Sequence, residues 1–416
     1  MKKAVKMKKA VKMKKAVKSV IKSSCCMLLL CGVAFVASVL GACSSGAGSG
    51  ESDEIKVIEM AKALASNPQE IALSEVATSV EYIPLDMGGE FLPGYNFLEM
   101  AVDENSIYFF PKPNFPNSPI FRFSADGKLL SHFKHVGRAE NEWVIPMGVV
   151  LDKANDQLIV NEETVVKFYT PQGEFVKSIN LDLPDYGFFT IVMYVGGKVQ
   201  FMKSAKEGYS TYALDVDDNG NVVSDNVLID YSTFPQEYWT DPSVRSRVEV
   251  ISKSSENYLL LHKFTDSIYS YRGTDSAEVA YVLDMGNLKD GYKRKVSMGG
   301  YCYEAPNFLI LQTVHPMKYF DNLQPSERMN YIFFDKAAGR TIKFAKNDEN
   351  DPYFKNDIDG GMPFFPYHIS GNKMYQLVDA YKFIEQADAT GSVKMREIAS
   401  KLNEDSNPVL VVATLK

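Results

Sequence analysis

The segment Val149–Val176 reads VVLDKANDQLIVNEETVVKFYTPQGEFV, and it contains four short runs rich in β-branched and aromatic residues. The runs are Val149–Asp152, Leu158–Val160, Val165–Tyr169 and Phe175–Val176, and the turn Pro171-Gln172-Gly173-Glu174 separates the last two. Runs of this length and composition between turn residues are typical of strands joined by hairpins. The segment therefore predicts a sheet of four short strands.

The same unit occurs before and after this segment. Residues 101–130 repeat the order of three strand-like runs, the turn Ala125-Asp126-Gly127-Lys128 and a final run, and the turn glycines Gly127, Gly173 and Gly220 are 46 and 47 residues apart. Four short strands at this period are typical of a β-propeller blade, because radial repetition leaves few exposed sheet edges.

Later units are less regular. Three pairs of strand-like runs follow the first three units: Tyr258–His262 with Ser267–Tyr271, Phe308–Thr313 with Tyr331–Phe334, and Pro363–Tyr367 with Met374–Val378. At roughly 50 residues per blade, the chain from Glu81 onward holds six or seven blades. The fold class predicted is all-β, a six-bladed β-propeller of four-stranded blades.

Both ends of the propeller read as strands, Val80-Glu81-Tyr82-Ile83 and Pro408–Ala413. We expect them to pair in one blade, because closing the ring in this way removes an exposed sheet edge. Short helices are predicted over Val57–Ala65 and Val393–Leu402, with Val393, Ile398, Ala399 and Leu402 on one face of the second helix.

The first residues read as a targeting segment. Lys2–Lys22 is basic and built from three copies of Met-Lys-Lys-Ala-Val-Lys, an apolar run follows at Cys25–Ala42, and Ser44–Gly50 holds only small residues. A basic flank, a short apolar core and a small-residue boundary are typical of an export signal. A membrane-spanning helix is the alternative, although no stop-transfer charges follow the 18-residue run.

The boundary Leu40-Gly41-Ala42-Cys43 resembles a bacterial lipobox, which implies a diacylglycerol group on the Cys43 thiol and cleavage before it. Two or more acyl chains give stable membrane anchoring. The predicted domains are a signal peptide over 1–42, a flexible lipid-anchored tether over 43–54, a lead-in segment over 55–79 and the propeller over 80–416.

The charge distribution argues against nucleic acid as a partner. Residues 1–43 hold ten lysines and no acid, so 35 basic and 52 acidic side chains remain after Cys43. A chain with a net charge near −17 repels the phosphate backbone of a nucleic acid.

The cysteines predict no disulfide. The mature chain would keep Cys43 and Cys302. Because an acylated cysteine cannot pair, we expect no disulfide and interpret Cys302 as a small buried hydrophobic residue.

Several stretches resemble known families. Residues 136–152, with Gly137, Trp143 and Pro146-Met147-Gly148 leading to Asp152, resemble an NHL-type repeat. The chain over residues 70–416 is similar to the six-bladed β-propeller lipoproteins of Bacteroides-type bacteria, a likeness that supports fold and location and assigns no catalytic activity. The stretches that carry it are Leu73–Glu75, Val80–Leu85, Gly137-Arg138, Thr265–Tyr269, Asn356–Gly361 with Phe364 and Pro366, and Asn407–Leu410.

Two groups of residues are candidate ligand contacts. Arg138, Glu140, Glu142 and Trp143 lie on the predicted loop between the first two full units, where an arginine beside a tryptophan could clamp a carboxylate and stack on a sugar. The alternative is that Trp143 fills the space between blades.

Asp357 and Asp359 could act as paired carboxylates next to Gly360-Gly361. Alternatively, they accept backbone hydrogen bonds where a blade begins near the crowded axis of the propeller.

Metal binding is weakly indicated, and we predict no cofactor. His262, His315 and His368 are 53 residues apart, but aligning the strands places Gln312 opposite His262, so the even spacing does not predict a shared zinc ion. Asp215, Asp217 and Asn219 match the start of a calcium loop, yet Asn226 stands where a bidentate acid is needed. A hairpin turn is the favoured interpretation.

These observations favour a lipid-anchored module at the outer membrane, on its periplasmic face or at the cell surface. We expect it to bind an envelope protein or glycan through its loops without catalysis. A propeller enzyme acting on peptide or carbohydrate, assisted by zinc or calcium, is one alternative, and a purely structural envelope component is another. No hydrolase elbow, Walker loop, zincin pair or dinucleotide fingerprint occurs in the sequence.

Overall fold

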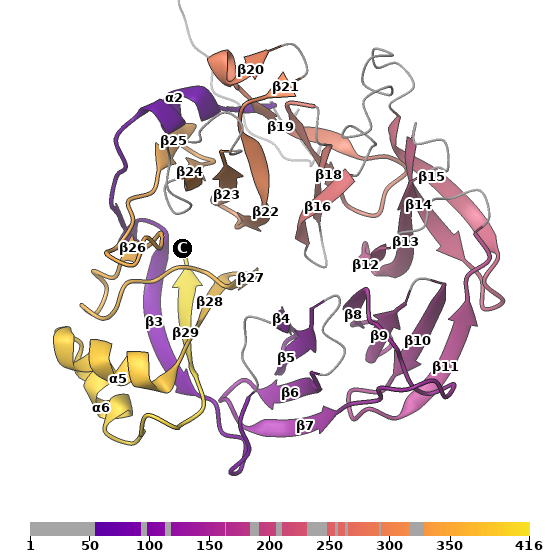
Figure 1. Ribbon diagram of the computed structural model, residues 1–416, viewed down its shortest axis with the longest axis horizontal. Coiled ribbons are helices and arrows are strands. Elements are labelled where there is room, and N and C mark those ends of the chain that lie inside the picture. Colours follow the sequence, from indigo (N-terminus) through magenta and orange to yellow (C-terminus); the bar gives the residue numbers. More distant parts are fainter. Residues whose placement is uncertain are drawn as a thin grey trace, which may run out of the picture. The chain divides into compact units, whose positions relative to one another are not determined.

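The computed structural model describes residues 55–92, 98–112, 118–162, 164–183, 191–204, 210–230, 248–253, 257–262, 265–290, 293–315 and 328–416. The chain divides into two units, Met1–Asp53 and Glu54–Lys416, and all the described residues lie in the second. In this unit six sheets, five with four strands and one with five, are arranged in a ring (Figure 1). The predicted six-bladed β-propeller is confirmed.

Within each blade the four strands are antiparallel neighbours. In chain order from the channel outward, blade 1 holds β4 (Leu98–Val102), β5 (Ser106–Pro111), β6 (Ile120–Ser124) and β7 (Leu129–Phe133). Blade 2 holds β8 (Gly148–Asp152), β9 (Gln157–Asn161), β10 (Val165–Tyr169) and β11 (Phe175–Asn180). Blade 3 holds β12 (Ile191–Val195), β13 (Lys198–Ser204), β14 (Ser210–Val216) and β15 (Val222–Asp230).

The remaining blades follow the same order with one exception at the closure. Blade 4 holds β16 (Val248–Lys253), β17 (Tyr258–His262), β18 (Ser267–Tyr271) and β19 (Glu278–Leu283). Blade 5 holds β22 (Ser297–Glu304), β23 (Phe308–Val314), β24 (Met329–Asp335) and β25 (Arg340–Lys343). Blade 6 holds β27 (His368–Ser370), β28 (Lys373–Val378), β29 (Val409–Leu415) and, outermost, the early strand β3 (Ala77–Pro84).

Blade 6 joins the two ends of the propeller. β29 pairs antiparallel with β3, with Val409 opposite Pro84 and Val412 opposite Glu81. The expected pairing of the two terminal strands is therefore confirmed. The first strand of blade 6 is β27, whereas the sequence predicts a strand at Pro363–Tyr367. The reason is that Pro363 and Pro366 have no N–H to donate to a sheet.

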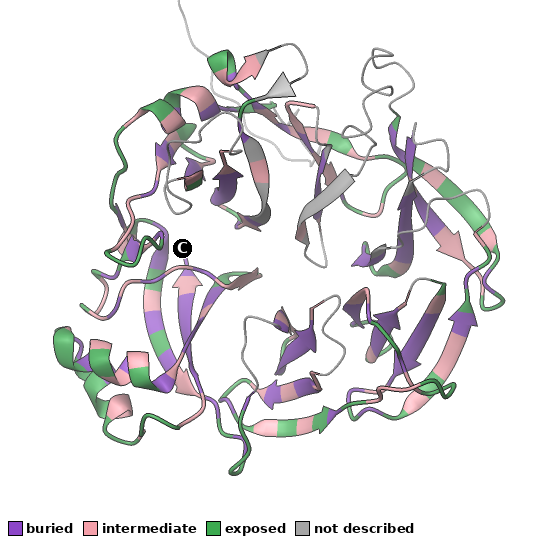
Figure 2. Cartoon of the chain, in the orientation of Figure 1, coloured by how far each residue is buried: buried purple, intermediate pink, exposed green. Residues whose placement is uncertain are grey.

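The hydrophobic core consists of six clusters, each between two neighbouring blades. Alternate residues of the middle strands face opposite neighbours: on β5, Tyr108 and Phe110 pack toward blade 2, while Ile107 and Phe109 pack toward blade 6. Both faces of a middle strand are thus covered, and the outer strands carry the exposed positions (Figure 2). This explains why runs such as Leu158–Val160 are continuously apolar.

The segment before β3 follows the outer edges of blades 4 to 6. β1 (Lys56–Ile58) pairs parallel with β19, α2 (Met60–Ala65) lies along blade 5, and β2 (Ile71–Ala72) pairs with β26 (Phe354–Lys355). η1 (Leu73–Glu75) then leads into β3. The helix predicted over Val57–Ala65 begins only at Met60. Its first residues form a strand because β19 offers a free edge that the local sequence does not reveal.

Two helices lie between β28 and β29. α6 (Val393–Ala399) begins where the predicted helix begins but ends before Leu402, and Ser392 caps it by accepting a hydrogen bond from the Met395 backbone (3.2 Å). Met395 is its buried residue, whereas Val393, expected on the inner face, is 72% exposed. α5 (Ala380–Ala389) was not predicted. No helix in the described part of the chain is long and apolar enough to span a bilayer.

Candidate functional site

Polar side chains of blade 2 contact the loop between β7 and β8 and hold it in place. Glu162 and Lys167 form an ion pair of 2.9 Å whose side chains are 15% and 10% exposed. The Glu162 carboxylate accepts the Val144 N–H (2.7 Å), and the Lys167 ammonium donates to the Glu142 carbonyl. The loop is therefore fixed by a buried ion pair, not merely by its own turns.

Further contacts fix the loop tip. The Tyr169 hydroxyl donates to the Asn141 carbonyl (3.1 Å), and the Glu142 carboxylate accepts the Ala139 N–H (2.9 Å). Burial raises the pKa of Tyr169, and the Glu162 and Glu142 charges raise it further. This hydroxyl therefore stays protonated and remains a donor.

The structure separates the four loop residues predicted to bind ligand. Arg138 and Glu140 are exposed at the tip, while Glu142 turns back to hold the loop. Trp143 is 0% exposed and packs between blades 1 and 2, with its ring 5.6 Å from Tyr169 and 6.2 Å from Phe133. The indole presents no face to solvent, so Trp143 cannot stack on a sugar in this arrangement and fills the space between blades.

Asp357 and Asp359 lie away from the central channel. The Asp359 carboxylate accepts hydrogen bonds from the Tyr82 hydroxyl (3.0 Å) and the Ser392 hydroxyl (2.9 Å), and from the Asn356 amide and the Gly361 N–H. Asp357 accepts the N–H and hydroxyl of Ser74 (2.9 and 2.6 Å). These contacts tie the closing strand β3 and its lead-in to blade 6. The structural alternative therefore accounts for both carboxylates.

The calcium-loop candidates form a hairpin turn between β14 and β15. Asp217 accepts the N–H groups of Asn219 and Asn221 (both 2.9 Å), and Gly220 has a φ of +85°. The Asp215 carboxylate points elsewhere and binds Ser224 and Gln200. The favoured hairpin interpretation agrees with this geometry.

The histidines do not converge in the part of the chain that the structure describes. His368 lies on β27 and His315 follows β23, while the side chain of His262 lies outside the described residues. Among the described residues no group of three or more His, Cys, Asp or Glu side chains could hold a metal ion. Cys302 is buried as expected, and burial raises the pKa of its thiol well above the usual range.

A large cavity occupies the centre of the ring. Its volume is about 2260 Å³, and residues of the innermost strands β4, β8, β12, β16, β22 and β27 line it. It continues over blade 6, where the loop around Asp348–Tyr353 and the α5 residues Lys382 and Glu385 also line it. Lys382 pairs with Glu349 across this extension (3.1 Å).

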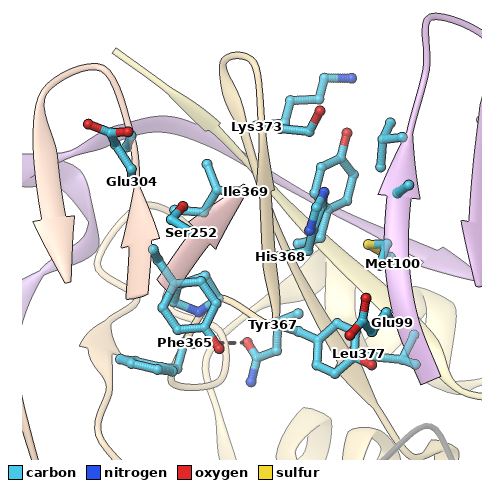
Figure 3. Close-up of a pocket in the computed structure, with 18 of the residues that line it drawn as sticks. Glu99, Met100, Ser252, Glu304, Phe365, Tyr367, His368, Ile369, Lys373 and Leu377 are labelled. Carbon is cyan, nitrogen blue, oxygen red and sulfur yellow. Dashed lines mark hydrogen bonds between the residues drawn. The ribbon is translucent and has the colours of Figure 1, made fainter. Parts of the chain in front are cut away.

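Side chains from several blades point into this cavity. Figure 3 shows Glu99 and Met100 of β4 beside Tyr367 and His368, with Phe365 further along the wall. Phe365 stands between Tyr303 and Tyr331, at ring-centroid distances of 5.9 and 5.2 Å. Tyr375 is largely covered, and burial raises its pKa to about 12. The wall therefore combines half-buried aromatic rings with neutral and charged hydrogen-bonding groups.

This wall could not be predicted from the sequence. Its residues come from different blades, and no motif joins them. The nearest signal was the run Met362–Tyr367, with two prolines and three aromatic residues ahead of a strand.

Comparison with protein families gives one match, a domain of unknown function named DUF4934, over residues 55–414. The chain belongs to the DUF4934 family. No curated protein matches it. The DUF4934 domain described here thus includes the lead-in along blades 4 to 6 together with all six blades.

Solved structures are similar to this DUF4934 domain to different degrees. A candidate exported protein from Bacteroides fragilis is 13% identical, with 87% of this chain and 100% of that chain covered and a TM-score of 0.58. A DUF4221 family member from Bacteroides vulgatus is 12% identical, and the match covers 82% of this chain and 97% of that chain with a TM-score of 0.45. Virginiamycin B lyase from Staphylococcus aureus is 10% identical, and the match covers 66% of this chain and 77% of that chain with a TM-score of 0.35. At these identities the likeness concerns the fold alone.

Proposed function

We propose that this chain is a cell-envelope protein, held at the outer membrane by lipid on Cys43, that binds a protein or glycan ligand through the central cavity of its propeller. The cavity is the observation that carries the proposal. Small-molecule sites usually occupy about 300–1,000 Å³, and the cavity measures about 2260 Å³. A ligand larger than a single small molecule fits this space best.

The extension of the cavity over blade 6 supports the same conclusion. The channel residues lie at the centre of the ring, whereas Lys382 and Glu385 belong to α5, outside the four strands of blade 6. A ligand in contact with both would be extended. Arg138 and Glu140, on their fixed loop, offer a second place where a partner could make contact, because a preorganised loop loses little conformational entropy on binding.

The test places a photo-crosslinking residue in the full anchored chain in cells. Substituted at Lys382, which lines the cavity, it is expected to capture a discrete ligand. Substituted at Val223, which is 64% exposed on the outer strand β15 and does not line the cavity, it should not. Equal capture at both positions, or at neither, contradicts binding through the cavity.

The anchor is tested separately by Cys43→Ala. Without the thiol no diacylglycerol can attach, so the protein should leave the membrane fraction and become soluble. A matched Cys302→Ala variant changes the other cysteine of the mature chain and should stay with the membrane. Membrane retention of Cys43→Ala would contradict the lipid anchor.

A further inference from the structure

Three aromatic side chains lie together on the cavity wall, and we call this cluster the aromatic shelf: Tyr303 of β22, Tyr331 of β24 and Phe365 of the segment before β27. All three are half-buried and line the cavity. The Phe365 ring stands at 89° to Tyr303 and at 76° to Tyr331. The shelf lies where blades 5 and 6 meet.

The shelf is rigid because the largest hydrophobic cluster supports it. All three rings pack against that cluster, and Phe365 contacts Phe344, which is 2% exposed, at 5.7 Å. The Tyr331 hydroxyl accepts a hydrogen bond from the Gln312 amide (2.7 Å), and Gln312 is itself buried. Rings held in this way lose little freedom on binding, so a stacking contact with them is not offset by ordering entropy.

The backbone beside the shelf is poorly suited to pairing with a peptide strand. Pro363 and Pro366 flank this segment and have no N–H, and the Phe365 N–H already donates to the Gln376 side chain (3.3 Å). Peptides that add to a sheet edge need such free donors. Recognition at this wall must therefore depend on ring faces and side-chain polar groups.

The charge of the cavity further narrows the ligand class. Among the described residues that line it, eight are acidic and six are basic. A lining with this balance does not attract a polyanion, and the net charge of the chain after Cys43 repels one. A neutral ligand with apolar ring faces and many hydroxyl groups matches the rings and the mixed polar groups together.

We propose that the aromatic shelf is a stacking subsite for a neutral oligosaccharide. The inference rests on the proposed function, because it names the ligand class of the same cavity. One sugar ring would place its C–H face on the shelf. Its hydroxyl groups would reach lining polar side chains such as Gln376 and Glu304.

The experiment measures binding by titration calorimetry on the full chain purified in detergent. The probes are the hexasaccharides of cellulose, xylan, mannan and laminarin, with hexagalacturonate as a polyanion and a Lys/Tyr/Trp hexapeptide as the competing class. We expect at least one neutral hexasaccharide to bind and Phe365→Leu to weaken it roughly three- to tenfold. Phe365→Tyr, which keeps the ring, should bind as the wild type does.

Phe91→Leu is the matched control, because Phe91 is 68% exposed and does not line the cavity. Thermal unfolding checks that each variant is folded. If sugar binding survives Phe365→Leu unchanged, or if only the peptide binds, the glycan subsite is wrong while the binding function stands. If no probe binds and Lys382 captures nothing in cells, the glycan subsite and the proposed function both fail.

Discussion

Gly220, in the turn of blade 3, lies directly against the Asn180 carbonyl at the end of the outer strand of blade 2. A Cβ atom at Gly220 would be 1.7 Å from that oxygen. Gly127 lies in the same way against the Pro84 carbonyl, whereas Gly173 lies against the side chain of Phe133. The glycine period seen in the sequence thus reflects contacts between blades as well as the turns themselves.

A hydrogen bond accompanies each of these glycines. The residue two positions after the preceding outer strand donates to the glycine carbonyl: the Asp86 N–H to Gly127 (2.8 Å) and the Asp182 N–H to Gly220 (3.2 Å). At Gly173 the partner is the ring nitrogen Nε2 of His135 (2.7 Å). His135 therefore supplies from its side chain the contact that the backbone makes elsewhere.

Gly220→Ala should destabilise the propeller strongly. The residue has a φ of +85°, which costs a non-glycine residue about 1–2 kcal/mol, and the new methyl group must also displace the backbone of blade 2. We expect a loss of about 3 kcal/mol or more in the free energy of unfolding, measured by urea denaturation. Gly339→Ala is the control, because its φ is +65° with nothing within 4 Å. Equal losses in the two variants would contradict the contact with Asn180.

Lys167→Met should also be costly. It leaves the Glu162 carboxylate buried without its partner, and breaking a buried pair from one side costs about 3–5 kcal/mol. The double variant Lys167→Met with Glu162→Gln should recover part of this loss in a double-mutant cycle. Lys401→Met is the control, because its pair with Glu397 is 63% and 70% exposed and should contribute about 0.5 kcal/mol. A Lys167→Met variant as stable as Lys401→Met would show that the loop does not depend on the ion pair.

Asp215→Asn should give a pH-dependent loss of stability. Burial raises the pKa of Asp215, but the hydrogen bonds from Ser224 and Gln200 and the charge of Lys198 outweigh it, so the pKa lies below the ordinary 3.8. Because the folded pKa is depressed, the stabilisation is complete above pH 3.8 and disappears as the pH falls through the folded value. The wild type should exceed the variant by about 1–2 kcal/mol at pH 7.

The two proteins should approach equal stability toward pH 2, which urea denaturation at several pH values measures. Thermal unfolding with added calcium provides a second measurement. In the hairpin interpretation, added calcium leaves the midpoint of thermal unfolding of the wild type unchanged. If calcium raises this midpoint in the wild type and Asp215→Asn abolishes the rise, the hairpin interpretation is wrong and the turn binds calcium.

Much of the fold could be predicted because its determinants are local and repeated. The turn glycines, the continuously apolar middle strands and the two terminal strands each leave a pattern in the sequence. α5 also leaves one, since its buried residues Ala380, Phe383 and Ala387 follow a helical spacing. β1 leaves none, because three residues become a strand only when the edge of β19 is present.

The candidate site was less predictable for a related reason. Trp143 beside Arg138 on a loop between blades allowed two interpretations, a ligand contact or a residue that fills the space between blades. Sequence spacing does not show which side of a loop faces the next blade, so it could not decide between them. The aromatic shelf combines residues 303, 331 and 365, and only the meeting of blades 5 and 6 brings them together. Residues that act through tertiary contact leave no local pattern.

Asp359→Asn distinguishes a structural carboxylate from a ligand contact. Four donors converge on Asp359, and an amide offers one acceptor oxygen where the carboxylate offers two, so buried donors such as the Tyr82 hydroxyl would lose their partner. Burial and the charge of Asp359 raise the pKa of Tyr82, so its hydroxyl stays protonated and cannot adapt by ionising. We expect a loss of about 2–3 kcal/mol in the free energy of unfolding, with no change in the affinity for a cavity ligand. The more exposed Asp357→Asn should cost about 1 kcal/mol. A variant of normal stability that no longer binds ligand would instead make Asp359 part of the binding site.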